Sequence, residues 1–195
     1  NDIRSVSKSI ISTIVGIAVD AGHISSVEDK VMTLFPEYDL LQNWHERKSD
    51  ISIRHLLTMS SGLACNDTQL VSPGGESTMF KSDDWLEHFL TLPSLREAGA
   101  EFAYCAGSVV GLAGILEKST HMKGIDFADE FLFKPLNINN YNWLKTNGDL
   151  LHPNGLFINS RDMAKIGQVM MTGKWNDQVI LSQEWITQAT SHQFT

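Results

Sequence analysis

The segment "SVSKSIISTIVGIAVDAG", residues 5–22, carries a helical pattern around which the rest of this chain can be arranged. Apolar side chains recur in it at three- and four-residue spacing, which is the period of one face of an α-helix. These side chains are Val6, Ile10, Ile14, Ile17 and Ala18, with Ile11 and Val15 widening the face. Glycine frequently ends a helix, so the pattern predicts a buried helix over residues 5–21 that stops at Gly22.

A serine and a lysine three residues apart, Ser5 and Lys8, stand at the head of this helix and on the same face of it. In the structural interpretation, Ser5 is an N-cap and Lys8 is a solvated side chain, and neither takes part in catalysis. The first 22 residues alone favour it, because chance gives about one Ser-x-x-Lys in such a chain. The alternative makes Ser5 a nucleophile, since helix-terminal N–H groups can stabilise an oxyanion and a lysine against apolar surface can accept the hydroxyl proton.

The other periodic segments predict a mostly α fold with a few short strands. Further helices are expected over residues 54–59, 83–91, 104–120, 124–134, 159–173 and 182–189, with a short one ended by Pro36. Short strands are expected near residues 51–53 and 155–159, and residues 64–78 are predicted to be a loop. The chain has the size of one domain, or of two small lobes sharing a core.

Composition excludes several classes of protein. The chain has 195 residues, 42% hydrophobic and 19% charged, with a net charge of −8. The charges form no basic cluster, so nucleic acid is not an expected partner. The apolar runs are too short and too interrupted for a transmembrane helix.

The metal-ligating residue types form no recognisable motif. The seven histidines are dispersed without an HxxxH or HExxH pair, so no metal site is expected. Cys65 and Cys105 do not form a CxxC pair, and two free thiols are the preferred interpretation. A single bridge in an oxidising compartment is the alternative.

Read in order, five segments resemble the serine β-lactamase-like hydrolases: class C β-lactamases, penicillin-binding proteins, esterases and the 6-aminohexanoate-dimer hydrolase type. They are "SVSKSIISTIVGIAVDAGHI", "ISIRHLLTMSSGL", "FAYCAGSVVGLAGILEKST", "FADEFLFKPLNI" and "GLFINSRDMAKIGQVMMTG". The resemblance covers nearly the whole chain, and Ser-x-x-Lys is a known nucleophile motif of such enzymes. It implies a serine hydrolase that acts through an acyl-enzyme and needs no metal or organic cofactor.

The resemblance also implies the roles of individual residues. Ser5 would be the acylated nucleophile, Lys8 its base partner, and Tyr104 in "YCAG" would exchange protons with Ser5 and the leaving group. Lys8 could supply the positive charge that a tyrosine needs to serve as a base. Gly155 and Leu156, which match a "GGL" turn of the family, are expected to line the substrate cleft.

Ala106 departs from the family pattern. β-Lactamases and penicillin-binding proteins commonly have asparagine at this third position of the tyrosine motif, where it helps to hold the substrate amide and the lysine. Alanine has no side-chain hydrogen bond to offer. The expected substrate is therefore a small-molecule ester or amide ahead of a β-lactam.

The family's third motif, a strand with Lys- or His-x-Gly after the "RDMA" helix, is not found before Thr195. "KTNG" at 145–148 and "HPNG" at 152–155 come too early and are interpreted as turns. The resemblance thus predicts the helical lobe of an α+β fold whose flanking antiparallel sheet is largely missing. Residues 1–195 would be a serine β-lactamase-like domain that is incomplete at both ends, with little or no turnover alone.

A second hypothesis is a non-catalytic, penicillin-binding-protein-like sensor or scaffold domain. The presence of Ser5, Lys8 and Tyr104 together argues against it, since an inactive domain need not keep all three. Family resemblance favours an exported or periplasmic protein. Neither the substrate nor the oligomeric state follows from the sequence.

Overall fold

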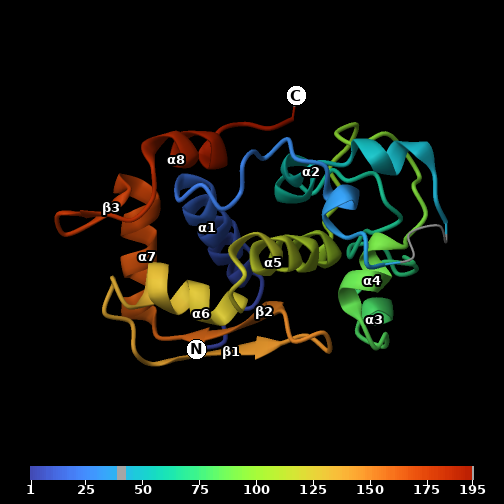
Figure 1. Ribbon diagram of the computed structural model, residues 1–195. Coiled ribbons are helices and arrows are strands. Elements are labelled where there is room, and N and C mark those ends of the chain that lie inside the picture. The colour runs from blue at the N-terminus through green and yellow to red at the C-terminus, as the bar shows by residue number, and fades with distance from the viewer. Residues whose placement is uncertain (39–42, 195) are drawn as a thin grey trace.

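A computed structural model describes residues 1–38 and 43–194. In these ranges eight α-helices alternate with short 3₁₀, π and β segments, and the two-stranded sheet β1–β2 lies along one edge of the helices (Figure 1). The α-helices are α1 (Val6–Asp20), α2 (Ile53–Leu57), α3 (Glu76–Met79), α4 (Trp85–Leu90), α5 (Ala106–Thr120), α6 (Gly124–Ala128), α7 (Ser160–Thr172) and α8 (Gln183–Thr190). The strands are β1 (Tyr141–Lys145), β2 (Leu151–Ile158), β3 (Lys174–Trp175) and β4 (Gln178–Val179). The remaining helical turns are η1 (Val31–Leu34), η2 (Glu46–Asp50) and the π-helical segment η3 (Asp129–Phe133). The predicted fold class, mostly α with a few short strands, is confirmed.

The core is built around α1 and α5, which pack against each other. α5 also contacts α2, α4 and α6, and its side chains are buried almost all the way round. Close approach depends on small residues on α5: a Cβ added at Gly107 would lie 2.6 Å from the Phe89 ring of α4. The helix predicted over residues 5–21 is therefore α1, held in the centre of the described fold.

The first three residues extend the sheet formed by β1 and β2. The Ile3 N–H donates to the Leu156 carbonyl at 3.2 Å, and Asp2 forms an antiparallel bridge with Phe157. These contacts bring the chain along β2 immediately before α1 begins. The start of α1 therefore lies beside β2, although about 150 residues separate them in sequence.

Strand β2 contains a bulge. Trp143 pairs with Leu156 and Lys145 pairs with Leu151, so Leu144 alone stands opposite residues 152–155. Extra residues in one strand of a pair bend it and re-aim its side chains. The interpretation of "HPNG" at 152–155 as a turn is wrong, because these residues form the bulge of β2. "KTNG" does lead into the turn between β1 and β2.

Two other local expectations are wrong. No strand forms at residues 51–53, because Ser52 makes only an isolated bridge with Lys30 and Ile53 begins α2. The loop predicted at 64–78 contains the start of the short helix α3. Strand β1, which no pattern predicted, forms by pairing with β2. None of the helices in the described ranges has the length and apolarity needed to cross a membrane.

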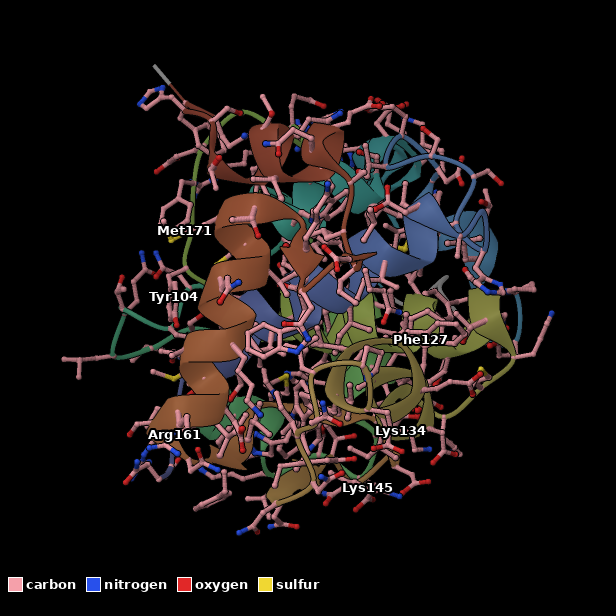
Figure 2. The ribbon with its side chains drawn as sticks, turned by 90° about the vertical axis from the view of Figure 1, so that its left-hand side faces the viewer. Tyr104, Phe127, Lys134, Lys145, Arg161 and Met171 are labelled. Carbon is pink, nitrogen blue, oxygen red and sulfur yellow. A yellow bond between two sulfur atoms is a disulfide. The ribbon has the colours of Figure 1, made fainter. Side chains whose placement is uncertain are left out.

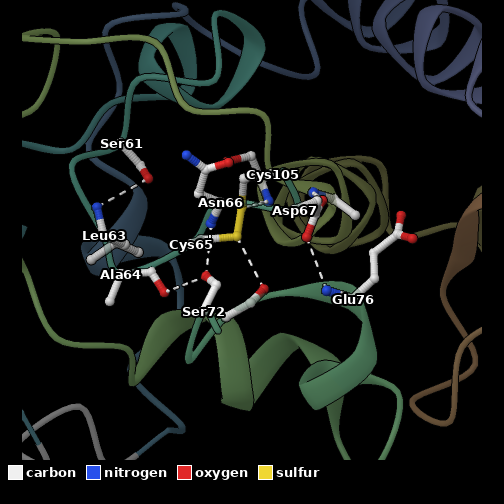
Figure 3. Close-up of a disulfide and its surroundings, with 12 residues drawn as sticks. Ser61, Leu63, Ala64, Cys65, Asn66, Asp67, Ser72, Glu76 and Cys105 are labelled. Carbon is white, nitrogen blue, oxygen red and sulfur yellow. Dashed lines mark hydrogen bonds between the residues drawn. A yellow bond between two sulfur atoms is a disulfide. The ribbon is translucent and has the colours of Figure 1, made fainter. Parts of the chain in front are cut away.

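Cys65 and Cys105 form a disulfide, so the expectation of two free thiols is wrong and the alternative of a single bridge holds. Their Cα atoms lie 5.5 Å apart, which is the usual separation for a disulfide. No local sequence pattern predicts this pairing, because 40 residues separate the two cysteines. Folding brings the loop after α2 against the segment that leads into α5 (Figure 3).

Candidate active site

Ser5 occupies the N-cap position of α1 without capping the helix through its side chain. Arg4, immediately before it, has a positive φ of 50°, a left-handed conformation that is uncommon for residues other than glycine. The chain therefore turns sharply between its pairing with β2 and the start of α1. This turn leaves Ser5 exposed at the helix end.

Lys8 lies one turn further along α1 and is only 7% exposed. Its Nζ lies 3.2 Å from Ser5 Oγ, within hydrogen-bond distance. The structural interpretation holds only for the position of Ser5, which is the N-cap residue of α1, because its hydroxyl does not cap the helix and Lys8 is not solvated. The structure brings together the first two residues that the sequence singled out.

Asn154, from the bulge of β2, completes the surroundings of this pair. Its Oδ1 accepts a hydrogen bond from Lys8 Nζ and lies 3.3 Å from Ser5 Oγ. Its Nδ2 donates to Oε1 of Glu76, the first residue of α3. This orientation of the amide is chemically consistent, since the oxygen faces an ammonium and the NH₂ group faces a carboxylate.

Glu76 also provides a negative charge for Lys8. The Glu76 Oε1 to Lys8 Nζ distance is 3.8 Å. A buried ammonium requires such partners, because an unpaired buried charge is costly. Lys8 is therefore surrounded by an amide oxygen, a carboxylate and the Ser5 hydroxyl.

Tyr104 also lies close to Lys8. Lys8 Nζ is 5.2 Å from the centre of the Tyr104 ring. Tyr104 directly precedes the disulfide-bonded Cys105, which is the N-cap residue of α5. All three residues predicted to be catalytic thus gather within one small volume.

The backbone amides at the start of α1 differ from the expectation. The N–H groups of Val6, Ser7 and Lys8 donate to carbonyls of the preceding turn at 3.0–3.1 Å. These groups are therefore not free to stabilise an oxyanion. Among the described residues the Ser5 N–H has no hydrogen-bond partner, and it remains the available amide at this position.

The three predicted substrate-binding residues have different surroundings. Ala106 is completely buried as the first residue of α5, and its N–H donates to Asp67 Oδ2 at 2.6 Å. Leu156 has its side chain in the core and donates its N–H to Ser7 Oγ at 3.2 Å. Gly155 belongs to the bulge, directly after Asn154. The residue from this segment that reaches Ser5 is therefore Asn154.

Sequence reasoning missed Asn154, Glu76 and Asp67. A signal for Asn154 was present, because proline and glycine inside a strand are typical of bulges. Pro153 and Gly155 flank Asn154 on its two sides. Glu76 and Asp67 carried no comparable signal, since both stand in a segment predicted to be loop.

Other titratable groups near the start of α7 serve its structure. Asp162 forms an ion pair with Lys165 at 2.7 Å, and the Asn159 side chain caps the helix. Figure 2 shows Arg161 and Met171 toward opposite ends of this helix. Within the described part of the chain, no group of three or more His, Cys, Asp or Glu side chains is arranged to hold a metal ion.

The chain matches known proteins over most of its length. The matching family model is described as Beta-lactamase and covers residues 2–194. The chain is 26% identical over 184 residues to 6-aminohexanoate-dimer hydrolase of Paenarthrobacter ureafaciens, a match that covers 88% of this chain and 45% of that protein.

Two of the solved structures that share the fold serve as examples. A D-stereospecific amidohydrolase from Streptomyces sp. superposes with a TM-score of 0.72 at 16% identity, covering 98% of this chain and 65% of that one. A penicillin-binding protein from Bacillus halodurans gives a TM-score of 0.70 at 17% identity, covering 95% and 63%. The chain therefore spans less than two thirds of the length of these relatives. The family match extends over almost every residue, and the chain belongs to the Beta-lactamase family of hydrolases.

Proposed function

We propose that this chain carries the nucleophile and the proton-transfer groups of a serine hydrolase that acts through an acyl-enzyme. The observation that carries the proposal is the 3.2 Å distance between the exposed Ser5 Oγ and the Nζ of buried Lys8. A nucleophile within hydrogen-bond distance of a base, which is itself oriented by further groups, is the usual arrangement of covalent catalysis. Asn154 and Glu76 provide that orientation for Lys8.

The proposed reaction conserves protons at each step. Lys8 first loses the proton of its resting ammonium to solvent. Ser5 Oγ then attacks the carbonyl carbon and its proton passes to the neutral Lys8 Nζ, while the Ser5 N–H stabilises the oxyanion. The intermediate collapses, the bond to the leaving group breaks, and that group takes a proton from Tyr104. Lys8 returns a proton to Tyr104, which restores both side chains.

Water completes the turnover. It attacks the acyl carbon, gives its proton to the same pair of side chains, and the Ser5 hydroxyl is regenerated as the acid leaves. Each step uses only groups of this chain and water. The bond broken is the ester or amide bond of a small molecule.

Ester and amide substrates rank ahead of β-lactams in this proposal. Ala106 has no side-chain amide, and Asn154 instead supplies the hydrogen-bond acceptor for Lys8 from β2. The relatives named as a 6-aminohexanoate-dimer hydrolase and a D-stereospecific amidohydrolase support an amide substrate. We still predict that Gly155 and Leu156 line the substrate cleft. Leu156 would contribute only its backbone there, because its side chain lies in the core.

We also propose that residues 1–195 are the helical part of a larger serine β-lactamase-like domain. The coverage of 45% and 65% of two relatives supports this assignment. A strand with a Lys- or His-x-Gly motif would complete the site. The disulfide supports an exported or periplasmic protein, because disulfides persist in oxidising compartments.

The test is covalent labelling with a fluorophosphonate, using the whole protein that carries this chain. Peptide mass spectrometry should place the label on Ser5, and Ser5→Ala should abolish it. Ser9→Ala is the matched control, because Ser9 is an exposed serine one turn further along α1 and should leave labelling unchanged. Absence of label on Ser5 would overturn the proposal and favour the non-catalytic sensor.

A further inference from the structure

Asp67 connects two parts of the candidate site that lie on different elements. Its Oδ2 accepts a hydrogen bond from the Ala106 N–H at 2.6 Å, and its Oδ1 accepts one from the Glu76 N–H at 2.9 Å (Figure 3). Its own N–H donates to the Tyr104 carbonyl at 2.7 Å. One residue therefore holds the backbone of two segments that each carry a neighbour of Lys8.

The two amides that Asp67 binds are the first residues of two helices. Ala106 begins α5, directly after Tyr104 and Cys105, and Glu76 begins α3. A carboxylate is a favourable partner at helix N-termini, because the first N–H groups lack partners within the helix. Asp67 thereby sets where α5 starts relative to α3.

Each of these helix starts carries a residue of the site. Tyr104 precedes α5 and lies beside Lys8, whereas the Glu76 side chain contacts Lys8 and Asn154. Asp67 therefore affects the position of Tyr104 relative to the Lys8 ammonium in two ways. It binds the backbone next to Tyr104, and it binds the N–H of Glu76, whose side chain contacts Lys8.

The disulfide reinforces this connection. Cys65 lies two residues before Asp67, and Cys105 lies between Tyr104 and Ala106. The covalent bond therefore joins the same two backbone segments that the Asp67 hydrogen bonds join. Asp67 is half-buried, and its loss would leave the two amides without these partners.

We propose that Asp67 is a positioning residue, which holds Tyr104 and Glu76 at the separation that proton transfer around Lys8 requires. The inference rests on the proposed acyl-enzyme function and deepens it. Asp67 itself does not touch the reacting atoms. It acts through the starts of α5 and α3.

The test separates binding from chemistry in the reaction of Ser5 with a fluorophosphonate, measured on the whole protein. Asp67→Ala should lower the maximal labelling rate about ten- to a hundred-fold, because small misplacements of catalytic groups have effects of this size. The concentration of probe at half-maximal rate should change less than about two-fold. Asp67→Asn keeps one carbonyl oxygen and should restore part of the rate.

Asp84→Ala is the matched control. Asp84 Oδ1 also accepts two N–H groups at the start of a helix, those of Leu86 and Glu87 on α4, but it has no hydrogen bond to the Tyr104 segment. Loss of this cap should lower stability without slowing the labelling of Ser5. Equal slowing in the Asp84→Ala and Asp67→Ala variants would overturn the proposal.

The remaining outcomes are also decisive. A folded Asp67→Ala variant that labels at the unsubstituted rate would overturn the role of Asp67 while leaving the proposed function intact. If Asp67→Ala does not fold, Asp67→Asn decides, and an unchanged maximal rate in it would overturn the proposal. Failure to label Ser5 in the unsubstituted protein would remove the proposed function and this role together.

Discussion

Lys8 and Asn154 are hydrogen-bonded to each other although 146 residues separate them in the chain. Lys8 reaches this position from the first turns of α1, and Asn154 reaches it from the bulge of β2. The contact depends on residues 1–3 pairing along β2, which brings the helix start to the strand. The surroundings of the candidate nucleophile are therefore a product of sheet pairing as much as of the helix.

Replacing Asn154 by alanine should slow the labelling of Ser5 about ten- to a hundred-fold. Hydrogen bonds to charged groups contribute about 1.5–3 kcal/mol, and Lys8 would lose its amide partner. Labelling rates of the Asn154→Ala and Asn142→Ala variants provide the measurement. Asn142 is exposed on the neighbouring strand β1 and should be neutral. Identical rates in the two variants would contradict an orienting role for Asn154.

Reducing the disulfide should lower the free energy of unfolding by about 4 kcal/mol, from the chain entropy of a loop of this length. The cysteines are 40 residues apart, and the bridge fixes the loop that carries Asp67. Denaturant unfolding with and without a thiol reductant measures the difference. A Cys65→Ser/Cys105→Ser double variant should be insensitive to the reductant. A similar response in that variant would show that the reductant acts elsewhere.

Two glycine-to-alanine substitutions in helices should change stability in opposite directions. Gly107→Ala places a Cβ 2.6 Å from the Phe89 ring and should destabilise the protein by about 1–3 kcal/mol. Gly167→Ala in α7 meets nothing within 4 Å and should stabilise it by about 0.5–1 kcal/mol. Thermal or denaturant unfolding of both variants gives the comparison. Destabilisation by Gly167→Ala would mean that α7 packs differently.

The buried Lys48 side chain should make stability depend on alkaline pH. It is fully buried, its Nζ has no hydrogen-bond partner in the described ranges, and burial lowers its pKa from 10.5 to about 8. Between these values the unfolded chain binds the proton and the folded chain does not. The free energy of unfolding should therefore rise from pH 8 to pH 10.5, by about 2–3 kcal/mol.

A substitution isolates this contribution. Lys48→Met should stabilise the protein at pH 7 and abolish the alkaline rise, because no buried ammonium would have to be desolvated. Lys174→Met, at an exposed position on β3, should leave the rise in place. Denaturant unfolding at several pH values from 7 to 10.5 measures all three proteins. If the free energy of unfolding of the Lys48→Met variant still rises with pH, another titrating group causes the rise.

Local patterns were enough to predict most of the helices. α1 and α7 were expected within a residue or two of their observed bounds, because apolar periodicity and capping residues act over a few positions. The helices expected to begin at residues 159 and 182 begin within one residue of these positions, with Asn159 and Ser182 as their N-caps. The bulge in β2 and the start of α3 were not, since both depend on partners from distant segments.

The sequence by itself determined the mostly α fold class, the buried helix α1 and the pairing of Ser5 with Lys8 on one helix face. A spacing of three residues in a helix brings two side chains together whatever surrounds them. Tertiary structure alone decided that Lys8 is buried, that Asn154 and Glu76 surround it, and that Cys65 bonds to Cys105. These contacts join segments 40 to 146 residues apart, and no local pattern encodes a contact made only when such segments pack together.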